Sequence, residues 1–295
     1  MQTGLVVKRF RKGIFITIFL CFLAVTSTAA GEETDFTIAI LPCLDEVMTL
    51  KKFYPMITYL EKKTELDVRI VVPKNFDSLQ SGLIKGDIDF ALQDPHTYVK
   101  LSQLFNKDTL IRTINPEGKT CENGVFVARK DSGIKKIEDL RGKTVLFGPK
   151  LSLTRWVAAK ELLRDNDIDL DKDLKAYFNS GCCVDIVFNV YLKEVDAGVI
   201  CKHFLESPSY KKADPGVDLQ QLIVIGQTKG VPLRIFVAQK DLPDDIVTTV
   251  IQALLELDRQ NPAHEKILLS AELGGFQKTS DKDYDDIRTL IGLKR

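Results

Sequence analysis

Hydrophobic positions along this chain recur with two periods, the two-residue period of strands and the roughly 3.6-residue period of helices. Short apolar runs rich in β-branched and aromatic residues are followed by longer amphipathic stretches, with polar turns between them. The first series predicts alternating strands and helices at residues 36–41, 46–63, 67–72, 76–85, 88–92 and 95–104. Such alternation predicts a largely parallel sheet with helices on both faces.

A second series begins at Val145 and predicts a second α/β lobe. Its helices and strands are expected at residues 154–166, 174–178, 184–192 and 197–201. Two stretches without a helical pattern, 124–129 and 222–238, suit strands that cross from one lobe to the other and back. Two C-terminal helices, at 244–258 and 264–270, would then return to the first lobe.

The predicted fold class is therefore α/β and two-lobed, with a ligand cleft between lobes that two crossing strands join. We expect lobe 1 to comprise residues 33–124 and 232–295, and lobe 2 to comprise residues 125–231. In open α/β sheets, ligands bind beyond the carboxyl ends of the strands. If the lobes face each other, the loops at these ends can line one cleft, which is the geometry of a binder that closes about a hinge.

The most informative of these strand ends is the sequence KTVLFGPKLSLTRWVAAK at residues 143–160. An apolar strand breaks at Gly148 and Pro149, and a helical pattern starts after Ser152 and Thr154. Hydroxyl groups and unpaired N–H groups at the start of a helix can bind an anion. The alternative is an ordinary Ser/Thr N-cap without a ligand.

The N-terminus has the pattern of a secretory signal peptide at residues 1–30. Four basic residues precede an apolar run at residues 14–25, and small residues follow, so we expect cleavage near Ala30 and a periplasmic protein. The whole chain has 41 Lys and Arg against 41 Asp and Glu, and loss of this segment leaves it mildly acidic. Nothing in this balance favours a nucleic-acid partner.

Several blocks of the chain resemble the phosphate/phosphite/phosphonate solute-binding family of ABC importers, which has the two-lobed type II periplasmic-binding-protein fold. The matching blocks are GDIDFALQDPHTYV, KDSGIKKIEDLRGKTVLFG and VDAGV, and the resemblance covers nearly the whole mature chain. It implies a periplasmic solute-binding protein for an ABC importer.

The resemblance also implies ligand-binding residues, with departures from the family pattern. The family's Ser-Thr-Ser-Gly turn falls on residues 152–155, so Ser152 and Thr154 keep hydroxyl groups while Arg155 replaces glycine. The other positions carried over are Phe76, Tyr98, Cys183, His203 and Arg234. Phe76 lacks the hydroxyl of the family's tyrosine, and Cys183 stands at the cleft histidine. His203 and Arg234 stand where some members have acids that hold an ammonium group.

These exchanges favour a compact oxyanion, such as phosphate, phosphite or a phosphonate-like anion, because a guanidinium group forms paired hydrogen bonds to oxyanions. The expected partners are this small anion and either an ABC permease or, as the alternative, the periplasmic domain of a sensor kinase. We expect a monomer without a cofactor, a metal ion or catalytic residues. A cysteine enzyme is the disfavoured class, because no GxSxG, HExxH or P-loop motif occurs.

The cysteines support a competing hypothesis. Five remain after the signal peptide, and Cys182 and Cys183 precede a predicted helix, a position that lowers the pKa of a thiol. With Cys43 at another strand end, these thiols could bind a thiophilic metal or metalloid. The alternative is a structural disulfide, formed by Cys43 or Cys121 with the pair or within the pair itself.

Overall fold

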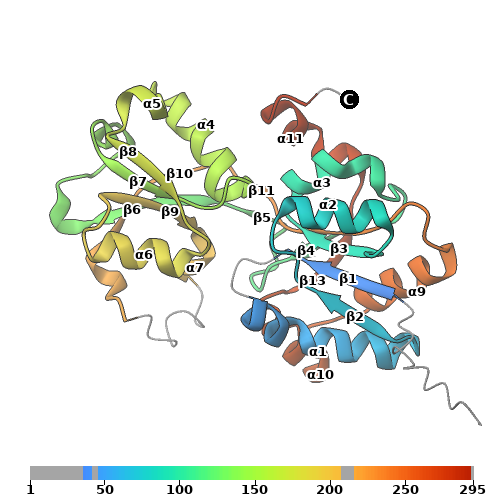
Figure 1. The fold of residues 1–295 in the computed structure, drawn as a ribbon. Coiled ribbons are helices and arrows are strands. Elements are labelled where there is room, and N and C mark those ends of the chain that lie inside the picture. Colours follow the sequence, from blue (N-terminus) through green and yellow to red (C-terminus); the bar gives the residue numbers. More distant parts are fainter. Residues whose placement is uncertain (1–35, 42–45, 207–215, 294–295) are drawn as a thin grey trace, which may run out of the picture. The chain divides into compact units, whose positions relative to one another are not determined.

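The computed structural model describes residues 36–41, 46–206 and 216–293. The expected signal peptide lies outside these ranges. The fold described lies within Thr34–Arg295. It contains two large sheets, each with its own helices (Figure 1). Within the described ranges, we find no helix whose length and apolar character would let it span a bilayer.

The first sheet has six strands in the order β13-β4-β12-β3-β1-β2. Their bounds are β1 Phe36–Ile40, β2 Val68–Val71, β3 Phe90–Gln93, β4 Ile111–Ile114, β12 Ile235–Ala238 and β13 Gly275–Lys278. Strands β1, β2 and β3 are parallel, whereas β12 runs antiparallel to β3 and β4, and β13 antiparallel to β4. The sheet is therefore mixed, and the expectation of a largely parallel sheet holds only for the strands near the N-terminus.

Both faces of the first sheet are covered, which explains why β1 is buried at every position. On one face, Phe36, Ile38 and Ile40 share a core with helices α1, α9 and α10. On the other, Ala39 shares a core with α2, α3 and α11. The bounds of these helices are α1 Glu46–Thr64, α2 Phe76–Lys85, α3 Pro95–Leu101, α9 Asp244–Leu255, α10 Pro262–Ser270 and α11 Asp285–Leu290. The predicted α/β fold class is confirmed.

The second sheet has five strands in the order β10-β6-β9-β7-β8. Their bounds are β6 Gly124–Arg129, β7 Thr144–Phe147, β8 Ala176–Asn179, β9 Ala197–Cys201 and β10 Leu222–Gln227. One face shares its core with α4, and the other with α6 and α7. The helices of this part are α4 Ala158–Asp165, α5 Leu170–Asp173, α6 Cys183–Tyr191 and α7 Lys202–Glu206. Strands β7, β8 and β9 are parallel, so their carboxyl ends lie at one edge of the sheet.

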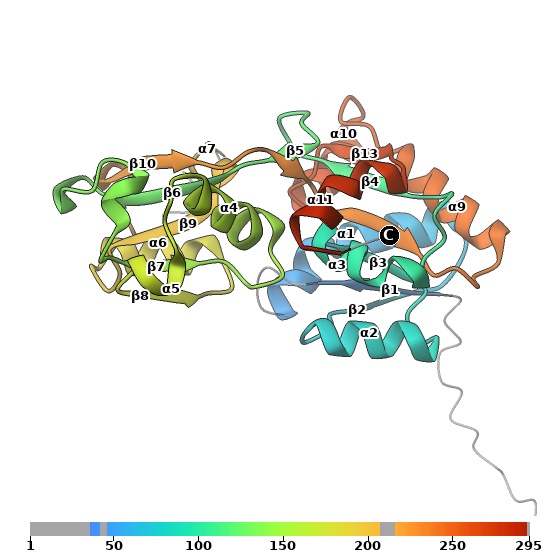
Figure 2. The same ribbon diagram turned by 90° about the horizontal axis from the view of Figure 1, so that it is seen from above.

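The chain passes between the two sheets along a short antiparallel pair, β5 Cys121–Glu122 and β11 Val231–Pro232 (Figure 2). The expected extended stretch 222–238 is thus three strands, β10, β11 and β12, which belong to three different sheets. A register shift in β10 between Val224 and Gly226 bends that strand, and Pro232 ends β11 because proline offers no N–H to a ladder. Short 3₁₀ turns occupy Ser102–Leu104, Lys130–Ser132, Ile137–Leu140, Leu219–Gln221 and Asp281–Tyr284.

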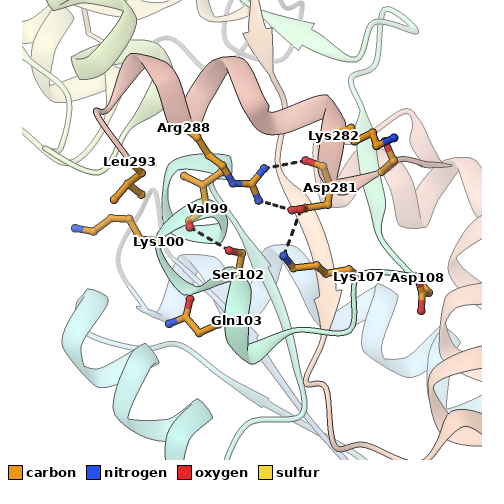
Figure 3. Close-up of a pocket in the computed structure, with 11 residues that line it drawn as sticks. Val99, Lys100, Ser102, Gln103, Lys107, Asp108, Asp281, Lys282, Arg288 and Leu293 are labelled. Atoms are coloured by element: carbon orange, nitrogen blue, oxygen red, sulfur yellow. Dashed lines mark hydrogen bonds and ion pairs between the residues drawn. The ribbon is translucent and has the colours of Figure 1, made fainter. Parts of the chain in front are cut away.

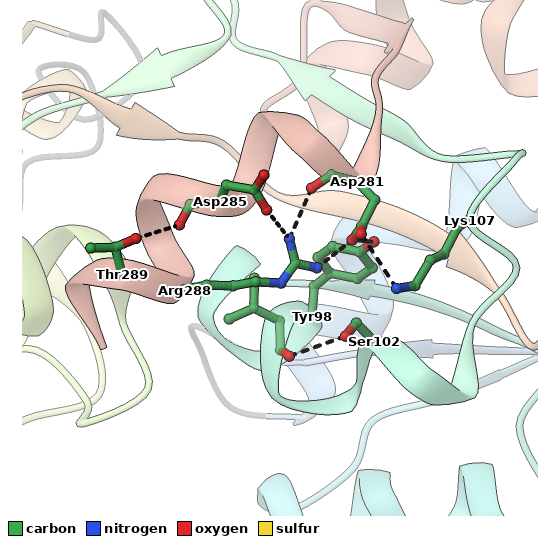
Figure 4. Close-up of polar contacts among 8 residues, drawn as sticks. Tyr98, Ser102, Lys107, Asp281, Asp285, Arg288 and Thr289 are labelled. Carbon is green, nitrogen blue, oxygen red and sulfur yellow. Dashed lines mark hydrogen bonds and ion pairs between the residues drawn. The ribbon is translucent and has the colours of Figure 1, made fainter. Parts of the chain in front are cut away.

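A polar cluster joins α3 to the C-terminal helix α11 (Figure 4). The hydroxyl of Tyr98 donates to Asp281 Oδ1 at 2.6 Å. The guanidinium of Arg288 bonds to the same carboxylate, and its Nη1 donates to Asp285 Oδ1 at 2.9 Å. Tyr98 is fully buried, and its ring lies edge-on to Tyr284 at 5.1 Å. Burial and the bond to Asp281 raise the pKa of Tyr98, so its hydroxyl stays a proton donor.

We predict that Tyr98→Phe lowers the free energy of unfolding by about 1.5 kcal/mol, because it removes a hydrogen bond to a charged group. Asp281 keeps Arg288 and Lys107 as partners, which limits the loss. Urea denaturation measures the effect. Tyr54→Phe is the matched control, since Tyr54 is 66% exposed. Equal stability of the two variants would contradict this role for the Tyr98 hydroxyl.

Candidate functional site

The loop after β7 places a cluster of main-chain N–H groups at the start of the helix that leads into α4. Residues Leu153–Val157 form a turn of π-helix before α4, and Ser152 Oγ caps it by accepting from Arg155 N at 3.1 Å. Turns of π-helix inside α-helices often occur at functional sites. Gly148 is required beside this turn, because a Cβ there would lie 2.5 Å from the Cβ of Arg155. The N-cap expected from the sequence is present.

Asp94 links this turn to the first sheet. Its Oδ1 accepts from His96 N at 2.8 Å, at the start of α3, and its Oδ2 accepts from Leu153 N at 3.2 Å. One carboxylate thus bridges two helix starts, one in each half of the fold. Burial of the carboxyl group raises its pKa to about 6, although the two N–H groups and the charges of Arg234 and Arg155 oppose the shift.

The side chain of Arg155 is buried close to Asp94. The residue is 4% exposed, and its Nη2 donates to the carbonyl of Gly181 at 3.1 Å. That bond ties the turn after β7 to the loop after β8. The neighbouring Thr154 is also buried, and its carbonyl lies so close to Gly124 that a Cβ there would approach to 2.7 Å. The start of β6 is therefore packed directly against the turn.

Gln93 is the last residue of β3 and immediately precedes Asp94. Its side chain is fully buried, yet neither amide atom has a hydrogen-bond partner among the described residues. Alternation along β3 places Gln93 on the same face as Ala91, whose core cluster includes Leu153 of the turn. A buried amide without partners costs free energy unless a ligand or water satisfies it. This amide therefore marks a polar position beside Asp94.

Two cysteines adjoin the same strand ends. Cys183 begins α6, and its Sγ accepts from Cys201 N, at the end of β9, at 3.4 Å. The interaction with the Cys201 thiol, together with the charge of Arg155, lowers the pKa of Cys183 despite burial. Burial raises the pKa of Cys182, so the expected lowering at this helix start is correct for Cys183 and wrong for Cys182.

The four described cysteines, Cys121, Cys182, Cys183 and Cys201, are free thiols. Neither a bridge within the Cys182–Cys183 pair nor one from Cys121 to that pair is formed. Cys43 lies outside the described residues. Within the described ranges, no group of three or more His, Cys, Asp or Glu side chains could hold a metal ion.

His203 follows Cys201 and bonds to the linking strand β5. Its Nδ1 lies 2.5 Å from Glu122 Oε2, and Glu122 is 6% exposed. Burial alone would lower the pKa of His203, but the hydrogen bond and charge of Glu122 raise it overall. The imidazole of His203 is thus paired with a buried acid that the sequence interpretation did not include.

Two of the aromatic residues expected at the site have other surroundings. The hydroxyl of Tyr98 is bonded to Asp281 in the cluster between α3 and α11. Phe76 is the first residue of α2, and the ammonium group of Lys100 lies over its ring, 4.7 Å from the ring centroid. The structure brings together Ser152, Thr154 and Arg155, with Cys183 beside Arg155 and the charge of Arg234 acting on Asp94.

Sequence reasoning missed Asp94, Gln93, Glu122 and Cys201. For the first two a signal was present, because an acid before Pro95 directly follows a buried strand end. Cys201 also ends a predicted strand. Glu122 had no such signal, since the two-residue strand that carries it has too little pattern to be recognised.

A separate pocket of about 900 Å³ lies between α3 and the C-terminal segment (Figure 3). Its lining includes Lys100, Lys107, Lys282 and Arg288, together with Asp281. Arg288 and Lys107 are both paired with Asp281. None of the ligand residues expected from the sequence lines this pocket. Arg288 and Asp281 belong to the polar cluster between α3 and α11.

Two α/β halves, a two-stranded link and polar groups at facing strand ends define the class of two-lobed binding proteins. A sequence profile described as "ABC transporter, phosphonate, periplasmic substrate-binding protein" matches residues 38–284. The chain belongs to this family.

Two known proteins match parts of this chain. The phosphate-import protein PhnD of Mycolicibacterium smegmatis is 27% identical over 125 residues, which are 41% of this chain and 39% of that protein. The tetrathionate sensor histidine kinase TtrS of Salmonella typhimurium is 23% identical over 180 residues, 58% of this chain and 30% of that protein. The matched stretches thus span well under two thirds of either relative.

Solved structures share the fold. The binding-protein component of an ABC phosphonate transporter from Pseudomonas aeruginosa superposes with a TM-score of 0.74 at 18% identity, covering 87% of this chain and 85% of that one. PhnD1 from Prochlorococcus marinus in complex with methylphosphonate also gives 0.74 at 18% identity, covering 86% and 96%. At this identity the likeness concerns the fold.

We predict that Asp94 makes the stability of the protein depend on pH. Its pKa rises from the usual 3.8 to about 6 on folding, so the folded state holds the proton more tightly. The resulting stabilisation is complete below pH 3.8 and disappears as pH rises through about 6, a change on the order of 3 kcal/mol.

The contribution of Asp94 is isolated by denaturant unfolding of the wild type and of Asp94→Asn at several pH values between about 4 and 7. As pH rises, the free energy of unfolding of the wild type should fall relative to that of Asp94→Asn. A difference that stays constant with pH would show that Asp94 keeps an ordinary pKa.

Proposed function

We propose that this protein is a periplasmic solute-binding protein that captures a small oxyanion for an ABC importer. The oxyanion binds at the turn Ser152–Arg155, opposite Gln93 and Asp94. The observation that carries this proposal is the contact of Asp94 Oδ2 with Leu153 N at 3.2 Å. At this position a helix start in one half of the fold already receives an anionic oxygen from the other half.

The donors of the turn suit a tetrahedral anion. The hydroxyl of Ser152 accepts from Arg155 N, which leaves its proton to donate to a ligand. Leu153 N and Arg155 N already donate to Asp94 Oδ2 and Ser152 Oγ, so a main-chain donor from this turn would come from Thr154 N. The positive end of the helix dipole favours negative charge. The hydroxyl of Thr154 stands in the same turn. The amide of Gln93 can donate to an oxyanion from the other half of the fold.

Charge at the site favours an anion of small size. Arg155 and Arg234 both act on Asp94, and His203 adds positive charge when protonated. Asp94 and Glu122 offset part of this charge. The balance favours a compact ligand such as phosphate, phosphite or methylphosphonate, whose oxygens can reach several donors at once.

Export and delivery follow from the family. We infer a signal peptide at residues 1–30 that is cleaved near Ala30, and a membrane permease that recognises the ligand-bound form. We place the lobe boundaries at residues 33–124 with 232–295, and at 125–231. The family profile supports the importer role over the sensor-kinase alternative. Tetrathionate, named for the sensor kinase relative, belongs in the ligand panel because it too is an oxyanion.

We predict that Arg155→Met weakens oxyanion binding by about ten-fold to a hundred-fold, because a charge-assisted hydrogen bond is lost. Isothermal titration with phosphate, phosphite, methylphosphonate and tetrathionate measures the effect. Arg164→Met is the matched control, since the Arg164 side chain in α4 is 71% exposed. Equal affinities of the two variants, or no binding of any of these anions to the wild type, would refute the proposal.

A second prediction concerns Gln93. In Gln93→Met the unpartnered amide is replaced by an apolar side chain of similar length, so the free energy of unfolding should stay equal or rise by about 1 kcal/mol. Oxyanion affinity should fall. Circular dichroism during urea unfolding and the same titrations provide both values. A stable variant with unchanged affinity would remove Gln93 from the site.

A further inference from the structure

Cys183 and Cys201 bring two thiols together from elements that are separate in sequence. Cys183 is the first residue of α6, and Cys201 is the last residue of the adjacent strand β9. The main-chain N–H of Cys201 donates to the Cys183 sulfur at 3.4 Å, and the Cys201 thiol interacts with the same sulfur. Both residues are only partly buried and are free thiols. The two residues are therefore in contact, and each keeps part of its surface in solvent.

The surroundings make one of these thiols the nucleophile. Cys183 faces the guanidinium of Arg155, the ring of His203 and the start of α6, and all three favour a thiolate. Cys201 faces Cys183 itself and the carboxylate of Glu122, which hold its proton in place. The surrounding charges thus favour a thiolate at Cys183, which can attack first, and a protonated thiol at Cys201, which can attack second.

We propose that Cys183 and Cys201 form a reversible dithiol–disulfide site whose substrates are small disulfides. The proposal rests on the contact between the two residues and on the partial solvent exposure of both. It extends beyond oxyanion capture, since nothing in that function requires a second cysteine beside the first.

The reaction balances without a cofactor. The Cys183 thiolate attacks one sulfur of a disulfide RSSR, the S–S bond breaks, and RS⁻ leaves. Cys201 then loses its proton and attacks the Cys183 sulfur of the mixed disulfide, which expels the second RS⁻. The two cysteines lose two electrons and RSSR gains them. The Cys201 proton passes to one released thiolate, and the other takes from solvent the proton that Cys183 gave up when it ionised.

Oxidation of this pair would also change the oxyanion site. The thiolate of Cys183 is a negative charge that Arg155 faces, and a disulfide is neutral. This consequence rests on the proposed function, in which Arg155 binds the ligand. The oxidised protein should therefore bind an oxyanion several-fold more tightly than the reduced protein.

The test uses the full mature chain in the Cys182→Ser background, where serine can still cap α6. After incubation with oxidised glutathione, trypsin digestion and mass spectrometry should join peptides 176–193 and 194–202 with the loss of two hydrogen atoms. Added Cys201→Ser should stop the reaction at a glutathione adduct on Cys183. Added Cys183→Ser should leave Cys201 largely unmodified.

Two results would overturn the proposal: no link between these peptides, or equal modification of Cys201 when Cys183 is absent. The exposed Cys121 reports the reactivity of an ordinary thiol in the same sample. Titration of methylphosphonate into the oxidised and reduced forms then tests the coupling, and equal affinities would refute it. If neither form binds an oxyanion, the proposed function fails while the peptide link still decides the chemistry of the cysteine pair.

Discussion

The arrangement of the site depends on one partly buried carboxylate. Asp94 accepts from His96 N and from Leu153 N, so the starts of α3 and of the turn before α4 share one anion. Each helix start has N–H groups without partners in its own helix, and an anion stabilises both. The apolar contacts of Leu153 with the first-sheet core surround this link and limit its access to water. The link therefore specifies where the two halves meet.

This constraint explains why so many polar groups gather at one place. A carboxylate out of water needs nearby positive charge, which Arg155 and Arg234 supply. Arg155 in turn needs space, which Gly148 provides, and an acceptor, which the carbonyl of Gly181 provides. In the function that we propose, neighbouring groups of the same turn bind an external oxyanion, because they suit the same kind of oxygen as the Asp94 carboxylate. Ligand binding and the contact between the halves would then depend on one turn.

The sequence predicts most of the fold, because the long amphipathic helices and buried strands carry strong periodic signals. Helix α1 and strand β9 lie within one residue of their expected ends. The short strands β5 and β11 have too few residues to show a hydrophobic period. The sequence therefore predicts long crossing strands in place of this short link. At the site, the helix start at Ser152 was predictable from its hydroxyls and the preceding glycine. The pairing of Cys183 with Cys201 was not, because strand order decides which strand end lies beside α6.

The central claim is that an oxyanion binds at the N–H groups of the turn Ser152–Arg155. A nitrogen-15 NMR titration with methylphosphonate tests it most directly, since it reports the main-chain N–H of Leu153 and the guanidinium of Arg155 separately. The account predicts saturable shifts of both signals, with the Arg288 and Lys107 signals unchanged. Shifts confined to the pocket of Arg288 and Lys107, with Leu153 and Arg155 unaffected, would contradict it.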